Sequence, residues 1–247
     1  MTQSLLLLLT VLGTSTLSGV FGMAGGLVLM GALLLQLPVP QAMVAHGILQ
    51  LAANGSRAAL LARHVRWPIL ATYAVGALLA VAALQVVQVA PSKPWVYLAL
   101  GIVPALAWLP AQRLRLDAAR PTHAAACGAA VTAMHIAAGA SGPLLDLFFA
   151  RTSLDRHTIV ATKAATQVLA HAVKVLFYLW LLGSARQEAW LDWRWLAAGA
   201  VVSLAGTWLG GRVLNRMTDR SFLRWTRWLI TAIGAVYLAQ AARMFAE

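Results

Sequence analysis

The chain opens on a long stretch without formally charged side chains. Residues 1–56 contain no Lys, Arg, Asp or Glu, and charged residues make up only 11% of the 247 residues. A soluble domain carries roughly 25% charged residues, so this chain has too few to cover a surface that faces water. The pattern predicts an all-α polytopic membrane protein. A secreted disulfide scaffold is excluded, because Cys127 is the only cysteine.

Apolar residues gather into eight segments, where about 20 residues make one membrane crossing. The segments cover residues 5–37, 39–61, 69–89, 95–109, 124–150, 158–182, 190–210 and 222–244. The first segment lacks the basic start of a cleavable signal peptide and is too long for one, so we expect it to stay in the protein.

The first and fifth segments are too long for one untilted helix, and small residues interrupt each of them. The interruptions are Gly22-Met23-Ala24-Gly25-Gly26 and Gly139-Ala140-Ser141-Gly142-Pro143, whose first glycines lie 117 positions apart. We expect both segments to be re-entrant: a broken helix that dips into the membrane and returns. The alternative is that these glycines only let helices pack closely.

The same offset of 117 relates the helices that follow the two glycine clusters. Polar residues stand at matching positions, namely His46, Gln50, Asn54 and Arg57 in one helix and Lys163, Gln167, His171 and Lys174 in the other. The sequence therefore predicts two internal repeats, 1–117 and 118–247, which together form one transport domain. Each repeat would hold one glycine-broken segment and about three transmembrane helices.

Basic residues indicate how these repeats are oriented. The sequence has 19 Lys and Arg against seven Asp and Glu, but the basic residues lie mainly between apolar segments, which favours membrane topology over nucleic-acid binding. Three loops are expected in the cytoplasm: one with Arg57, Arg63 and Arg66, one with Arg113, Arg115 and Arg120, and one with Arg212, Arg216, Arg220, Arg224 and Arg227. The three loops lie on the same side of the membrane if the broken segments are re-entrant. That topology puts both termini outside and inverts the second repeat relative to the first. Eight full crossings with parallel repeats are the alternative.

Each set of polar residues falls on one face of its helix, because its members are spaced by three or four residues. Polar groups inside a bilayer face protein or a wet cavity, and a helix that restarts after a break directs unpaired N–H groups and its positive dipole end inward. We therefore predict a site for a small anion, and we expect no nucleic acid, metal or bound cofactor. The predicted site residues are Gly22, Gly25, Gly26, His46, Gln50, Asn54, Gly139, Ser141, Gly142, Lys163, Gln167 and His171.

Three further residues have two interpretations each. Arg57 and Lys174, at the ends of their helices, either contact the anion or extend to the membrane surface. Asp146 is either a partner of Lys163 or a carboxylate that couples proton movement to transport.

The glycine-broken motifs carry a family resemblance. Residues 18–26, Ser-Gly-Val-Phe-Gly-Met-Ala-Gly-Gly, followed by Pro38 and the stretch to His46, resemble the first signature of the TauE/SafE sulfite exporter family, and residues 162–167 with His171 and Lys174 resemble its second. The resemblance implies a multi-pass permease of the bacterial inner membrane that carries sulfite, a sulfonate or a related organic acid. Asp146 and His46 depart from the residues usual in that family.

Other functions are weighed against transport. An intramembrane enzyme would use His46, His171 or Asp146, but the sequence has no H-E-x-x-H or G-x-S-x-G motif. A non-transporting scaffold would not need two matched polar stripes inside the membrane. Gly210, Gly211 and residues 197–199 could support a homo-oligomer through close helix contacts. The direction of transport stays open.

Overall fold

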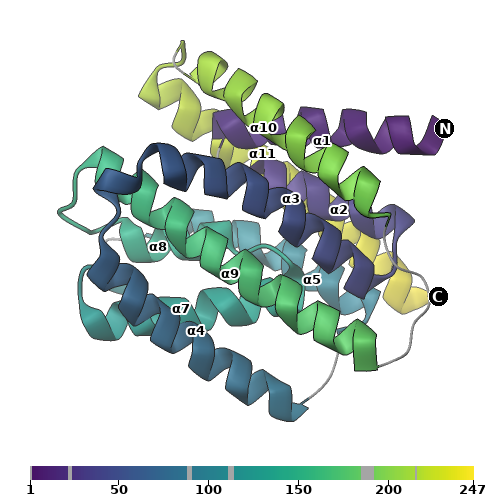
Figure 1. The fold of residues 1–247 in the computed structure, drawn as a ribbon, viewed down its shortest axis with the longest axis horizontal. Helices are drawn as coiled ribbons and strands as arrows, with labels where there is room; N and C mark the ends of the chain where they lie inside the picture. Colours follow the sequence, from purple (N-terminus) through teal and green to yellow (C-terminus); the bar gives the residue numbers. More distant parts are fainter. Residues whose placement is uncertain (1, 22–23, 88–90, 111–113, 185–191, 215) are drawn as a thin grey trace.

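The computed structural model describes residues 2–21, 24–87, 91–110, 114–184, 192–214 and 216–247. These residues form helices and no strands, which confirms the predicted all-α class (Figure 1). In chain order the helices are α1 (Thr2–Phe21), α2 (Ala24–Gln36), α3 (Val39–Leu60), α4 (Trp67–Val87), α5 (Lys93–Ile102), α7 (Pro121–Ala138), α8 (Gly142–Phe149), α9 (Arg156–Ser184), α10 (Trp193–Leu214) and α11 (Asp219–Ala246), with 3₁₀ turns η1 (Ala62–His64) and η2 (Val103–Trp108).

Several helices are suited to lipid by both length and surface. Within the described residues, four stretches are long and apolar enough to cross a membrane: Trp67–Gln85, Arg156–Gly183, Trp193–Leu214 and Arg224–Ala246. Their apolar side chains also point outward, as Leu78 and Leu79 of α4 show, each 65% exposed. Exposed leucines in such number are unfavourable in water and favourable in lipid. The chain is therefore a polytopic membrane protein.

The fourth apolar segment differs from its prediction as one crossing helix. Its α-helical part, α5, has only 10 residues and continues as the 3₁₀ turn η2, in which Pro104 follows Val103. Proline has no N–H to donate to the preceding turn, which ends the regular helix there. At about 1.5 Å per residue, α5 alone covers roughly half of a bilayer core of about 30 Å.

Both glycine-broken segments consist of two helices. Gly139 ends α7 with a left-handed backbone, φ 81°, a conformation that glycine adopts without a steric penalty. Helix α8 restarts at Gly142 with Pro143 in its first turn, as predicted. In the first segment, α1 ends at Phe21 and α2 begins at Ala24, so Gly25 and Gly26 lie inside the new helix rather than before it. Gly22 lies outside the described residues.

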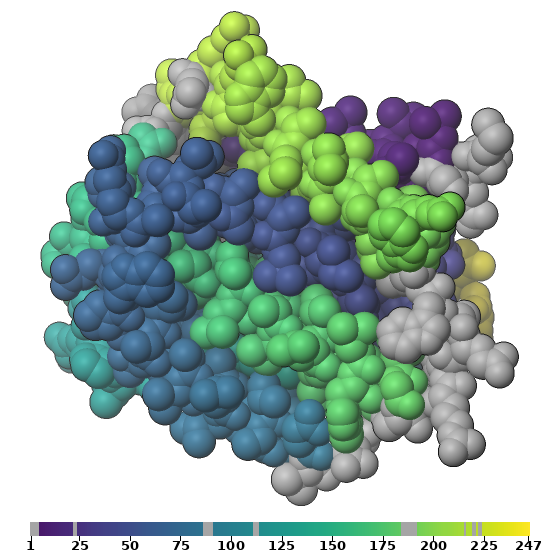
Figure 2. Space-filling model, viewed as in Figure 1, coloured from purple at the N-terminus to yellow at the C-terminus, as the bar shows by residue number. Residues whose placement is uncertain are grey.

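Helices of the two halves pack in exchanged pairs. Helix α1 lies against α10, α4 against α7, α3 against α9, and α5 against α11. The pairs α1·α10 and α4·α7 approach closely at glycines: a Cβ at Gly210 would overlap Gly19, and one at Gly128 would overlap the carbonyl of Tyr73. Figure 2 shows α3, α9 and α10 adjoining on one face of the molecule. This exchange is what two inverted repeats would produce, but the repeats and their boundary stay predictions.

Gly210 and Gly199 are occupied by contacts within the chain, Gly210 with α1 and Gly199 with the Leu49 side chain. A Cβ at Gly211 would meet nothing. Two of the glycines proposed for a homo-oligomer thus serve intramolecular packing, and the homo-oligomer itself stays a prediction.

The chain ends and the basic loops lie at opposite ends of the molecule. Both termini are on the right in Figure 1, whereas the α3–α4, α5–α7 and α10–α11 connections are on the left. The arrangement agrees with re-entrant broken segments, and it argues against eight full crossings, which would separate the α10–α11 connection from the other two. The side that faces the cytoplasm stays a prediction.

Candidate functional site

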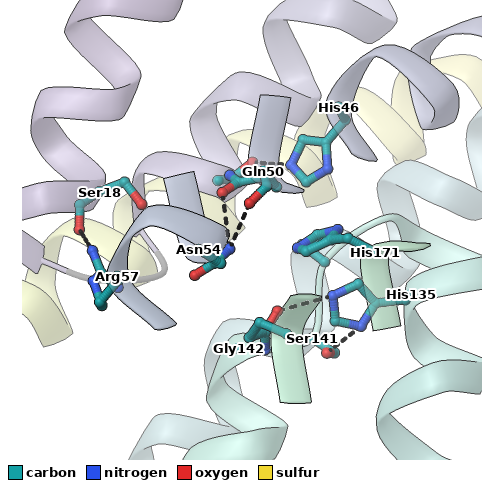
Figure 3. A pocket seen from close by; sticks show the side chains of 12 residues that line it. Ser18, His46, Gln50, Asn54, Arg57, His135, Ser141, Gly142 and His171 are labelled. Atoms are coloured by element: carbon teal, nitrogen blue, oxygen red, sulfur yellow. Dashed lines mark hydrogen bonds between the residues drawn. The ribbon is translucent and has the colours of Figure 1, made fainter. Parts of the chain in front are cut away.

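A cavity with about 390 Å³ of empty space lies where the two halves meet. Side chains and backbone from both glycine-broken segments and from α3 and α9 form its lining (Figure 3). The lining residues are Ser18, Gly26, His46, Gln50, Asn54, Arg57, His135, Ala140, Ser141, Gly142, Gln167 and His171. None of these twelve residues is acidic.

The first half contributes a polar face of α3 that is held by hydrogen bonds to its surroundings. His46 Nε2 lies 2.9 Å from the carbonyl oxygen of Gly26, and Asn54 Nδ2 donates to the carbonyl oxygen of Gln50 at 3.1 Å. Arg57 Nη2 makes a long contact of 3.5 Å with the carbonyl oxygen of Ser18. His46 and Gln50 are buried, whereas Asn54 and Arg57 are partly exposed and lie in the last two turns of α3, which lead to the α3–α4 connection.

The second half contributes a linked set of polar side chains around His135. Its Nε2 lies 3.2 Å from Gln167 Oε1, and its Nδ1 lies 2.6 Å from the Ser141 hydroxyl and 2.9 Å from the carbonyl oxygen of Val131. These bonds leave Gln167 Nε2 and His171 Nδ1 buried without a hydrogen-bond partner in the described part of the chain.

Lys174 connects the halves beneath the cavity. It is 0% exposed, and its Nζ donates to the carbonyl oxygen of Gly139 at 3.0 Å and to His46 Nδ1 at 2.9 Å. With Nδ1 accepting, His46 carries its proton on Nε2 and donates to Gly26. Lys174 is not in the lining, so neither interpretation predicted for it, direct anion contact or extension to the surface, describes its position.

Lys163 lies elsewhere than predicted. Its Nζ pairs with Asp146, and the two side chains are 25% and 46% exposed, outside the cavity lining. The ion pair with Asp146 holds the lysine outside the cavity lining. Of the two roles predicted for Asp146, the structure shows the ion pair.

The remaining predicted residues divide between lining and support. Gly26, His46, Gln50, Asn54, Arg57, Ser141, Gly142, Gln167 and His171 all line the cavity. Gly25 instead supports packing, because a Cβ there would overlap α1 near Thr14 and Ser18. Gly139 supports the site through its carbonyl bond to Lys174.

Sequence reasoning missed His135 and Ser18, which both line the cavity. A signal for them was present, since the offset of 117 that relates the two stripes also relates these two positions. Ala140 is a third addition to the predicted set.

Outside the membrane-spanning segments, Asp155 precedes α9. Its carboxylate accepts the Thr158 hydroxyl at 2.6 Å and the backbone N–H groups of Thr158 and His157 at 3.1 and 3.0 Å. The hydrogen bonds with Thr158 are the main cause that lowers the pKa of Asp155. Asp155 therefore anchors the start of the helix that carries Gln167, His171 and Lys174.

A helical membrane protein with broken helices meeting at a polar internal cavity has the architecture of a transporter. The chain matches the model of the family described as "Sulfite exporter TauE/SafE" over residues 6–238. It belongs to this family and is a membrane transporter rather than an enzyme. Searches of curated proteins and of solved structures found no match.

Proposed function

We propose that this protein carries a small oxyanion, such as sulfite or a sulfonate, across the bacterial inner membrane by alternating access around the cavity. The observation that carries the proposal is the pair of buried, unpartnered nitrogens, Gln167 Nε2 and His171 Nδ1, on residues of a cavity whose lining has no carboxylate. An unsatisfied buried donor such as Gln167 Nε2 costs about 1–3 kcal/mol, which a bound acceptor would recover.

Charge and dipole act in the same direction. Arg57 brings a guanidinium to the cavity, and Lys174 lies directly behind His46. Gly142 opens α8, and no side chain caps the first turn of that helix, so its N–H groups and positive dipole end remain available. An oxyanion offers several acceptors to such converging donors, whereas a metal cation would find no carboxylate in the lining.

The two ends of the cavity differ in access. Arg57 and Asn54 are partly exposed at the end with the basic loops, while Lys174 is fully buried at the other. We take this conformation to be the one that is open toward the basic loops, the predicted cytoplasmic side. A cysteine introduced at Asn54 should then react with a membrane-impermeant thiol reagent from that side. Reaction only from the opposite side would contradict this assignment.

Thermal stabilisation of the purified protein by anions tests the binding site. A ligand at 100 times its Kd stabilises by about 2.7 kcal/mol. We expect sulfite, sulfate or methanesulfonate to raise the Tm of the wild-type protein, with acetate as the carboxylate comparison. The double variant Gln50→Leu/Gln167→Leu should stay folded but show no rise in Tm with these anions. Gln36→Leu, which changes an exposed glutamine on α2, is the matched control. Stabilisation that persists in the double variant would refute the site.

Transport itself is measured in proteoliposomes. Flux of the stabilising anion should require Gln50 and Gln167 and should be unaffected by Gln36→Leu. An anion that binds but is never transported would favour the scaffold alternative.

A further inference from the structure

Three buried imidazoles that line the cavity and one lysine outside the lining form a continuous row. Lys174 Nζ lies 2.9 Å from His46 Nδ1. The His46 and His171 ring centroids are 5.5 Å apart, and those of His171 and His135 are 4.5 Å apart, edge to face. All four side chains are at most 3% exposed. The three histidines line the cavity, with His171 between the other two (Figure 3).

The outer members of the row are held in place, but the central one is not. His46 is held between Lys174 and the Gly26 carbonyl, and His135 between Ser141 and Gln167. By contrast, His171 Nδ1 has no hydrogen-bond partner in the described part of the chain. His171 Nδ1 is therefore the buried ring nitrogen of the row that no hydrogen bond occupies in the described residues.

The charges around His171 make its protonation depend on the cavity's contents. The titratable groups that face it are His135 from α7, His46 from α3, and Lys174 from α9 itself. Arg57 of α3 lines the same cavity, while Asp146 of α8 pairs with Lys163 instead. The cations disfavour an imidazolium at this position, whereas an anion bound in the cavity would favour it. Anion and proton should therefore bind together.

We infer that His171 takes up the coupling proton and that one proton moves with each anion. The proton enters His171 from the aqueous side to which the cavity is open and leaves to the opposite side with the anion. His46 and His135 act as positioning residues, and Lys174 keeps the neighbouring charge positive so that the proton is released once the anion departs. This inference rests on the proposed function, and it names His171 in place of Asp146 as the coupling group.

The test measures anion affinity against pH with methanesulfonate and sulfate, which keep their charge over about pH 5 to 8, where histidine titrates. Any pH dependence then belongs to the protein. If one proton is bound with each anion, Kd rises about tenfold per pH unit above the titration of His171. We expect His171→Gln to remove this slope, and His123→Gln, at the start of α7 and outside the cavity, to retain it.

Three outcomes would contradict the proton coupling, and a fourth would contradict the proposed function on which it rests. A slope that survives in His171→Gln, or a slope lost in Asp146→Asn, assigns the proton elsewhere. If the wild-type protein binds either anion without any pH slope, the proton coupling fails while the proposed function stands. If it binds neither methanesulfonate, sulfate nor sulfite, the proposed function itself fails.

A second measurement needs no variant and so does not depend on folding of a substituted protein. Adding methanesulfonate or sulfate to the wild-type protein in weak buffer with a pH indicator should raise the pH as protons are taken up, one for each anion bound. Binding without proton uptake would contradict the inference.

Discussion

The two ends of the α3·α9 helix pair carry residues that the repeat offset of 117 relates, but these residues make different contacts. At one end His46 meets Lys174, both buried and in contact at 2.9 Å. The matching residues at the other end are Lys163 and Arg57, and each binds its own partner: Lys163 pairs with Asp146, and Arg57 reaches the Ser18 carbonyl. One end is closed across the halves and the other is not.

The difference follows from a single chemical property. A neutral imidazole can accept a hydrogen bond from a lysine, so His46 and Lys174 can join two helices inside the protein. The side chains of lysine and arginine have only hydrogen-bond donors, and both carry a positive charge. Lys163 and Arg57 therefore cannot hydrogen-bond to each other across the other end. The residue that stands opposite the cation therefore decides which end of the cavity is sealed.

The largest expected effect comes from making the two ends alike. His46→Lys places a second cation against Lys174 without a counter-charge, and an uncompensated buried charge costs about 3–5 kcal/mol. Thermal denaturation in detergent should show a large loss of stability. The exposed His157→Lys serves as the control and should change little. An unaltered Tm in His46→Lys would mean that the His46–Lys174 contact does not hold the closed end.

Removing the cation from the open end should affect binding rather than stability. Arg57→Met loses only a long bond of 3.5 Å, so the fold should tolerate it. A hydrogen bond to a charged group contributes about 1.5–3 kcal/mol, so the Kd for sulfate should rise roughly ten- to a hundredfold. Anion titration by thermal shift provides the measurement, with exposed Arg63→Met as control. Equal affinities in the two variants would remove Arg57 from the site.

The Lys163–Asp146 pair should contribute less. Both side chains are partly exposed, and pairs of this kind stabilise by about 0–1 kcal/mol. A double-mutant cycle with Lys163→Met and Asp146→Asn, followed by chemical denaturation, should give a coupling energy in that range and leave anion affinity unchanged. A strong loss of affinity in Lys163→Met would return this lysine to the binding site.

The smallest effect is expected at Asp155, which starts α9 at the open end. Because its pKa is lowered in the folded protein, its contribution to stability is present above the unfolded-state pKa of about 3.9 and is lost as pH falls through the lowered folded value. Asp155→Asn should lower Tm slightly near neutral pH and converge with the wild type in acid. A difference that grows toward low pH would contradict this assignment.

Local patterns were sufficient for much of the fold. The apolar segments predict the helical membrane class, and the cluster at 139–143 predicts the break between α7 and α8. The two polar stripes together with the two glycine clusters predict nine of the cavity residues. Helix periodicity carries this information, because it fixes which residues share a face without any knowledge of neighbouring helices.

The errors concern contacts between helices. Lys163 has a position on α9 that favours the cavity, but the carboxylate of Asp146 on α8 holds it outside. Lys174 was assigned to a helix end, yet it is fully buried because its helix runs on to Ser184. Periodicity does not contain such information, since it depends on how neighbouring elements are placed in three dimensions.

The sequence by itself determined that this chain is a helical membrane protein with two broken segments and two polar stripes, because composition and periodicity act locally. Only the tertiary structure decided that His135 and Ser18 join the site, that Lys163 leaves it, and that Lys174 closes one end against His46. These outcomes depend on which donor reaches which acceptor across helices, and a buried polar group settles where its hydrogen bonds can be satisfied.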